Sequence, residues 1–184
     1  MKKGLLVFFA VILLLVGGIF VSYNGMVTAN ENVNGKWSQV ETQLQRRSDL
    51  IPNLVNTVKA YSAHESQIFT DVANARAKLA GAQNVSEAAQ ANGELSSALN
   101  RLLAISENYP QLKANTNFIQ LQDELAGTEN RLAVARKDYN DAAQAYNADI
   151  KSFPTMLVAR IMGFQERSYF KAETQAQKAP QVNF

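Results

Sequence analysis

Cysteine is absent from this chain of 184 residues, and histidine occurs once, at His64. The lack of cysteine excludes disulfide bonds, catalytic thiolates, zinc–thiolate sites and lipidation of a cysteine. A metal centre needs several ligands, and no Glu-x-x-His repeat accompanies His64. We therefore predict no metal site and no cofactor, and we interpret His64 as a surface residue near the start of a helix.

Excess charge is also nearly absent. The 18 basic and 16 acidic residues give a formal net charge of +2, and Lys2 and Lys3 account for that excess. The rest of the chain is neutral and its basic residues are scattered, which gives no electrostatic reason to bind nucleic acid. The glycines form no phosphate-binding loop, and the Gly-x-Ser-x-Gly pattern of a nucleophile elbow is missing. These absences predict a protein that is not an enzyme.

A long apolar run near the N-terminus is the first positive feature. Residues 5–21 are all apolar when Gly17 and Gly18 are counted, and as a helix they would span about 25 Å, the short end for a bilayer crossing. Tyr23 follows the run and can lie at the membrane interface. Lys2 and Lys3 precede the run, and these positive charges predict a cytoplasmic N-terminus and a domain outside the cytoplasm. The alternative is a cleaved signal peptide, since residues 27–29 have a small-x-small pattern.

Apolar residues then recur at alternating steps of three and four, the spacing of a helical heptad seam. The first seam runs from Val33 to Tyr61 and includes Arg47. Its phase survives Pro52, so we expect one kinked helix that leaves a backbone bond open near Ser48 and continues from the anchor. Three further seams follow, over residues 68–79, 86–109 and 118–146, with Phe153 continuing the last phase and Pro154 breaking it.

Together these patterns predict an all-α fold with an N-terminal transmembrane helix followed by a long antiparallel four-helix bundle. The expected organisation is an anchor over residues 1–23, a helical bundle over residues 24–170 and a mobile polar tail over residues 171–184. A short apolar piece, residues 156–164, is expected to cap one end of the bundle.

The segment from Gln43 to Val55, QLQRRSDLIPNLV, closely resembles the LemA family. Further matches occur in order along almost the whole chain, at Trp37, Ala75-Arg76, Phe153-Pro154 and the terminal Val182-Asn183-Phe184. The resemblance implies an N-terminal membrane helix and a four-helix bundle, but no activity, because the family has no agreed biochemical function. It also implies an N-terminus outside the cell, opposite to the orientation that Lys2 and Lys3 favour, and a membrane zinc metalloprotease as one candidate partner.

The polar residues of that motif, Arg46, Arg47, Asp49 and Asn53, form the candidate site. Arg47 lies on the apolar seam, so its charge needs an acceptor from a neighbouring helix. Arg46, Asp49 and Asn53 share the spacing of one helix face. We expect a structural role, with Asp49 satisfying the turn opened by Pro52 or pairing with Arg46. The alternative is a docking surface for a partner protein or a lipid phosphate.

The interpretation that these observations favour is a scaffold of the bacterial cell envelope, tethered to the lipid bilayer and bound to another envelope protein. The alternative function is a receptor that holds a small molecule or lipid in a bundle cavity near Arg47, Tyr139 or Tyr146. For Trp37, Tyr139 and Tyr146, all at seam positions, packing in the core is the expected role.

Overall fold

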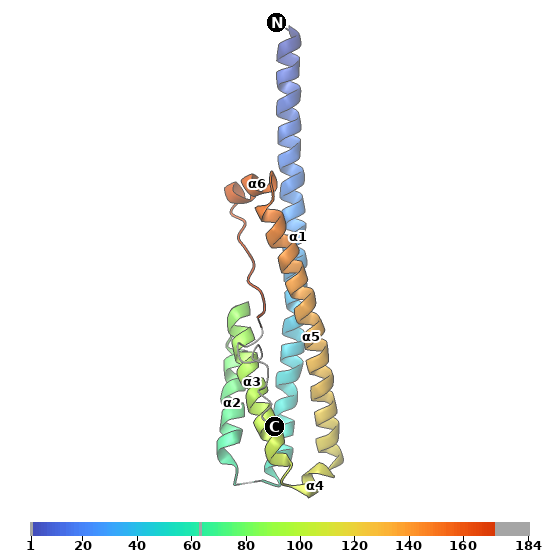
Figure 1. Ribbon diagram of the computed structural model, residues 1–184, viewed down its shortest axis with the longest axis vertical. Helices are drawn as coiled ribbons and strands as arrows, with labels where there is room; N and C mark the ends of the chain where they lie inside the picture. Colours follow the sequence, from blue (N-terminus) through green and yellow to red (C-terminus); the bar gives the residue numbers. More distant parts are fainter. Residues whose placement is uncertain (1, 63, 172–184) are drawn as a thin grey trace, which may run out of the picture. The chain divides into compact units, whose positions relative to one another are not determined.

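The computed structural model describes residues 2–62 and 64–171. This part of the chain is mainly helical, has an irregular segment at residues 164–171, and contains no strand. The predicted all-helical fold with a long apolar N-terminal helix and a helical bundle is confirmed (Figure 1). The elements are α1 (Lys2–Lys59), α2 (Ser66–Ala80), α3 (Val85–Ser106), α4 (Pro110–Lys113), α5 (Thr116–Lys151) and α6 (Thr155–Met162).

Helix α1 runs without interruption from the apolar segment through Pro52. A proline inside a helix removes one backbone donor, so one carbonyl loses its partner while the bonds on either side persist. The expectation of one helix that passes Pro52 and continues from the anchor is therefore confirmed. The N-terminal part of α1 is long and apolar enough to cross a membrane, and its most apolar window is not buried within the protein.

The chain divides into two compact units. Unit 1 comprises residues 2–38 and Asp138–Ser168, and unit 2 comprises Gln39–Lys137 with residues 169–171. Both α1 and α5 contribute to each unit, and each unit has buried apolar side chains of its own.

Unit 2 is the helical bundle, with α1, α2, α3 and the first part of α5 running in alternating directions (Figure 1). The seams predicted from the sequence supply its core, which includes Ile51, Leu54, Val72, Leu79, Leu95, Leu99, Leu102, Phe118 and Leu132. Burial of these side chains is the main stabilising contribution, at about 1.5–3 kcal/mol for each large one.

The start of α3 shows how local sequence sets a boundary. The Asn84 side chain accepts a hydrogen bond from the Glu87 amide at 2.9 Å, and the Glu87 carboxylate accepts one from the Gln83 amide at 2.8 Å. This reciprocal cap fixes the first turn, so that the helix begins at Val85, one residue before the predicted Ser86. Helix α2 ends before Gly81, as the sequence predicted.

Unit 1 contains the N-terminal part of α1, the end of α5 and α6. Its buried apolar side chains come from all three helices and include Met26, Val33, Tyr146, Ile150, Val158 and Ala159. The expectation that Phe153 continues the α5 seam is wrong, because α5 ends at Lys151 and the Phe153 side chain is 78% exposed. The segment expected to cap a bundle end buries only Val158 and Ala159 of α6. The predicted mobile tail lies outside the described residues, apart from Lys171.

Candidate functional site

The QLQRRSDLIPNLV motif lies on α1 within unit 2, and its proline determines the local chemistry. Pro52 has no amide hydrogen, so the Ser48 carbonyl four residues earlier has no donor in its own helix. Arg76 of α2 supplies one. Its Nε lies 3.0 Å from the Ser48 carbonyl oxygen and 3.1 Å from the Ser48 hydroxyl. The backbone group opened by the proline thus becomes a joint between α1 and α2.

The expected role of Asp49 at this turn needs correction. A carboxylate only accepts hydrogen bonds, whereas the group that Pro52 leaves open is itself an acceptor. Asp49 instead accepts a hydrogen bond from the Gln45 amide, one turn earlier on the surface of α1, at 2.8 Å. Arg46 pairs across the surface with Glu124 of α5 at 3.2 Å. Asn53 is exposed, and its backbone carbonyl accepts a bond from the Thr57 hydroxyl.

Arg47 is buried in unit 2, and its guanidinium joins three helices. Its Nη1 lies 2.7 Å from a Glu129 carboxylate oxygen of α5 and donates to the Asn92 side chain of α3 at 2.8 Å. The acceptor that the seam position of Arg47 required is therefore present. Asn92 is itself buried, so this pair of contacts fixes the register of α1 against α3 and α5.

A second arginine shares the same carboxylate. Arg136 Nη2 lies 3.6 Å from the other oxygen of Glu129, and the Arg136 guanidinium lies 4.9 Å from the centre of the Phe170 ring. We call Arg47, Asn92, Glu129 and Arg136 the arginine cluster. It brings two cations to one anion, with Arg47 buried and the Glu129 side chain 43% exposed.

The electrostatics of the arginine cluster reflect that imbalance. Burial lowers the pKa of the Arg47 guanidinium, Glu129 opposes this shift and Arg136 adds to it. Burial likewise lowers the pKa of Arg136, again opposed by Glu129. Both side chains remain charged at neutral pH, because an arginine starts from a very high pKa. Glu129 is thus the residue on which the stability of the cluster depends.

Unit 1 contains a comparable joint around Arg167, in the extended segment after α6. The Arg167 guanidinium donates to the side chains of Asn30 and Asn34 on α1, at 2.7 and 2.9 Å. Its backbone amide donates to the Asn147 side chain of α5, which in turn donates to the Arg167 carbonyl, both at 2.8 Å. We call these four residues the Arg167 clamp.

Two tyrosines of α5 extend this region. The Tyr139 hydroxyl donates to the Ser168 carbonyl at 2.7 Å, and its ring meets Trp37 edge to face at 5.3 Å. Tyr139 and Tyr146 are buried and Trp37 is half-buried, in agreement with the expected packing role. Burial raises the pKa of both tyrosines, and the positive charge of Arg167 partly opposes the shift.

The Arg167 clamp left little sign in the sequence. Asparagine at positions 30, 34 and 147 looks like ordinary polar surface in a helical pattern, and nothing local indicates a distant backbone segment. The one available signal was spacing, since Asn30 and Asn34 lie one turn apart on the same face of α1.

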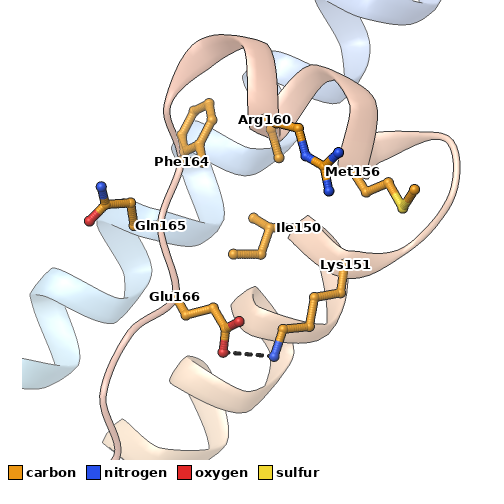
Figure 2. A pocket seen from close by; sticks show the side chains of 8 residues that line it. Ile150, Lys151, Met156, Arg160, Phe164, Gln165 and Glu166 are labelled. Atoms are coloured by element: carbon orange, nitrogen blue, oxygen red, sulfur yellow. Dashed lines mark ion pairs between the residues drawn. The ribbon is translucent and has the colours of Figure 1, made fainter.

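A pocket of about 570 Å³ lies in unit 1, between the end of α5, α6 and the segment that follows it (Figure 2). The Ile150 side chain points into it, and the Lys151–Glu166 ion pair closes one side at 2.7 Å. The complete lining is Ile150, Lys151, Met156, Ala159, Arg160, Phe164, Gln165 and Glu166. None of the residues near which a ligand cavity was expected, Arg47, Tyr139 and Tyr146, takes part in this pocket.

Within the residues that the structure describes, no group of three or more histidine, aspartate or glutamate side chains could hold a metal ion. His64 is exposed, just before α2. The arginine cluster and the Arg167 clamp are polar contacts, buried or partly buried, that join helices.

Comparison with known proteins identifies the family of this chain. The model of the LemA family matches residues 36–184, which include the Pro52 motif, the arginine cluster and two members of the Arg167 clamp, Asn147 and Arg167. The chain belongs to the LemA family.

Named relatives of this LemA-family chain include magnetosome proteins. Magnetosome protein MamQ 2 of Paramagnetospirillum magneticum is 30% identical over 179 residues, which cover 83% of this chain and 66% of the relative. MamQ of Magnetospirillum gryphiswaldense is 29% identical over a similar range, and protein LemA of Metamycoplasma hominis is 22% identical over 90% of this chain and 78% of its own. The chain thus spans just under two thirds of the length of the MamQ proteins.

Proposed function

We propose that this protein is a non-catalytic helical scaffold, tethered to the membrane by α1, that presents its bundle to a protein partner in the bacterial cell envelope. The observation that carries the proposal is how the polar residues of the LemA motif are used. Arg46, Arg47 and Asp49 bind other side chains of the protein, and Arg76 binds the carbonyl that Pro52 leaves open. The motif thereby stabilises the shape of a surface and leaves the exposed helix faces for recognition.

Site-specific photo-crosslinking in intact cells tests this scaffold function. A photoreactive side chain at the exposed position Asn53 of α1, with a second at Ser86 of α3 for comparison, should give different patterns of adducts. We expect one envelope protein to be captured from one helix face and not from the other, as identified by mass spectrometry. Equal labelling of abundant proteins from both positions would contradict a specific docking face.

The side of the membrane also belongs to the proposal. Lys2 and Lys3 precede the apolar segment, and we propose that they keep the N-terminus in the cytoplasm, with the bundle outside. Because the chain has no cysteine, a Ser86→Cys variant carries one thiol on the bundle. A membrane-impermeant maleimide should label it in intact cells. Labelling only after lysis would place the bundle in the cytoplasm.

A second candidate function is a receptor for a small molecule or lipid, and the pocket beside α6 is the observation that favours it. A volume of about 570 Å³ is in the range of ligand sites, and its lining combines apolar side chains with Lys151, Arg160 and Glu166. Native mass spectrometry of the protein from mild detergent should then show a bound mass that Ala159→Trp, which fills the pocket, removes. A protein without bound mass in both forms would favour the scaffold.

A further inference from the structure

Helix α6 buries Val158 and Ala159 but presents its four larger apolar side chains outward, which is unusual for a helix that packs on a water-soluble core. Ile161 is 79% exposed, and Leu157 and Met162 are about half exposed. Phe153, just before α6, is 78% exposed as well. We call Phe153, Met156, Leu157, Ile161 and Met162 the α6 apolar face. Large apolar groups gathered in this way on a monomer usually mark a contact surface.

The position of α6 along α1 indicates what that surface contacts. Gly163 ends α6 in the left-handed conformation, with φ at 77°, and this turns the chain so that Phe164 comes back to α1. The Phe164 ring there packs edge to face on Tyr23, with 5.8 Å between ring centres. In Figure 1, α6 accordingly lies beside α1 just below its free N-terminal part.

Tyr23 marks the end of the apolar segment of α1. It follows Val21 by two residues, a rise of about 3 Å along a helix. Every residue from Leu5 to Val21 is exposed, whereas Met26 is buried in unit 1. Tyrosine is enriched where a transmembrane helix leaves the hydrocarbon layer. The contact between Tyr23 and Phe164 therefore places α6 at the level of the bilayer surface.

We infer that the α6 apolar face is a second membrane-binding site, which inserts into the interfacial zone of the same leaflet that α1 leaves at Tyr23. The inference rests on the proposed membrane attachment through α1. Leu157 and Ile161 lie one turn apart on α6 and enter the boundary between headgroups and acyl chains. Arg160, exposed beside them, also lines the pocket of unit 1, and from there its guanidinium can reach the lipid phosphates.

A lipid surface fits this face better than a second protein does. A stable protein interface takes about 20–30 residues from each side, whereas α6 has 8 residues and offers a few side chains. The face also lies close to the end of the apolar segment of α1, because Phe164, two residues after α6, packs on Tyr23. Two points of attachment then hold unit 1 at a fixed rotation about α1, since a single helix alone would leave that rotation free.

The absence of cysteine makes a direct test possible on the full chain. Single-cysteine variants Phe153→Cys, Leu157→Cys and Ile161→Cys carry a spin label in vesicles of phosphatidylethanolamine and phosphatidylglycerol. Leu14→Cys reports the apolar segment of α1, and Val134→Cys is the matched control, an exposed apolar side chain on α5 in unit 2. Collisions of each label with oxygen, which concentrates in lipid, are compared with collisions with a water-soluble nickel chelate.

We expect oxygen collisions to prevail at Leu14 and at the three positions of the α6 apolar face, and nickel collisions to prevail at Val134. Labels on α6 that are as open to nickel as Val134, with Leu14 still in lipid, would overturn the α6 site and leave the anchor intact. A Leu14 label in water would overturn the anchor and this inference together. Labels on α6 shielded from both reagents would assign the face to a protein contact and overturn the membrane assignment.

A charged substitution provides the second readout. Ile161→Asp in the Leu157→Cys chain should lower the oxygen collisions of the label and raise those of nickel, because a carboxylate withdraws from the acyl boundary. The chain should still sediment with membranes after carbonate extraction, since α1 is unchanged. Unaltered lipid contact of the Leu157 label would overturn the role of this face.

Discussion

Among single residues, arginine joins separate segments of the chain in both units. Arg76 binds a backbone carbonyl of another helix, Arg47 binds side chains of two helices, and Arg167 binds two asparagines of α1. A guanidinium suits this role because it carries five donors in a rigid plane and stays charged when half-buried. A lysine at any of these positions would reach fewer acceptors at once.

The link between Pro52 and Arg76 gives a prediction about coupling. Arg76→Ala should lower the free energy of unfolding by about 1–3 kcal/mol, since it leaves the Ser48 carbonyl without a donor. A Pro52→Ala chain regains a backbone amide at that position, which can donate to the carbonyl, so the same Arg76→Ala change should cost clearly less there. Chemical unfolding of the four chains, followed by circular dichroism in detergent, measures the difference. Equal losses in the two backgrounds would show that Arg76 acts by another route.

The tyrosines of α5 predict sensitivity to alkali. Burial raises the pKa of Tyr139 and Tyr146 in the folded protein above the value of about 10 expected in an unfolded chain. Their contribution to stability is complete below a pH of about 10 and is lost as pH rises through the folded pKa, because the unfolded chain releases these protons first. Melting temperatures measured from neutral pH upward should therefore fall above that point, and less steeply for Tyr146→Phe. Tyr169→Phe, which removes an exposed hydroxyl, is the matched control and should follow wild type.

Among the helices, those of unit 2 are held in register by polar contacts laid over an apolar core. Ile51 and Leu54 of α1 supply burial, but burial alone tolerates sliding by a turn. The ion pair of Arg47 with Glu129 and its hydrogen bond to Asn92 favour one register, because each pairs groups that are costly to leave unmatched.

The arginine cluster yields a prediction about which member matters most. Glu129→Gln should cost about 1–3 kcal/mol of stability, because it leaves Arg47 and Arg136 facing each other without an anion. Arg47→Met should cost less, since it removes one of the two competing cations, fills a similar volume and leaves Arg136 paired. Thermal melts of both variants compare them. A larger loss for Arg47→Met would mean that the bond to Asn92 outweighs the charge balance.

Much of the helical arrangement was accessible from sequence. Apolar residues spaced alternately three and four apart predicted the four long helices. This spacing is visible in the sequence because a helix that buries one face needs apolar residues at that period. The seam position of Arg47 required an acceptor from another helix, and Glu129 and Asn92 meet that requirement. The continuity of α1 through Pro52 followed from the unbroken phase.

The remaining features depend on contacts between distant segments, which no local pattern records. The hydrogen bond from Arg76 to Ser48 could be predicted only if the position of α2 beside the proline turn were known. The Arg167 clamp could be predicted only if it were known that the segment after α6 returns along α1 and α5. The outward apolar side chains of α6 could not be predicted, because a run of apolar residues does not reveal which of its members face outward.

For the molecule as a whole, one segment commits the chain to the membrane. A chain that starts at Asn24 lacks the apolar run but keeps the buried residues of α1 from Met26 onward. We expect it to be strongly helical by circular dichroism and to be released from the membrane fraction into solution. The full chain should stay with membranes after carbonate extraction. A helical truncated chain that still binds vesicles would point to the α6 apolar face as its remaining contact, and an unfolded one would show that folding needs the anchor.

The bond between Arg76 and Ser48 also bears on how such sequences diverge. A proline at position 52 leaves one carbonyl open that a donor from α2 completes, so the two positions form one inherited unit. A chain in which another residue replaces the proline regains the backbone amide donor at position 52, and substitutions at position 76 then cost less stability. Descendants should therefore keep both residues or lose the proline first, and chains that retain the proline without the arginine should be rare.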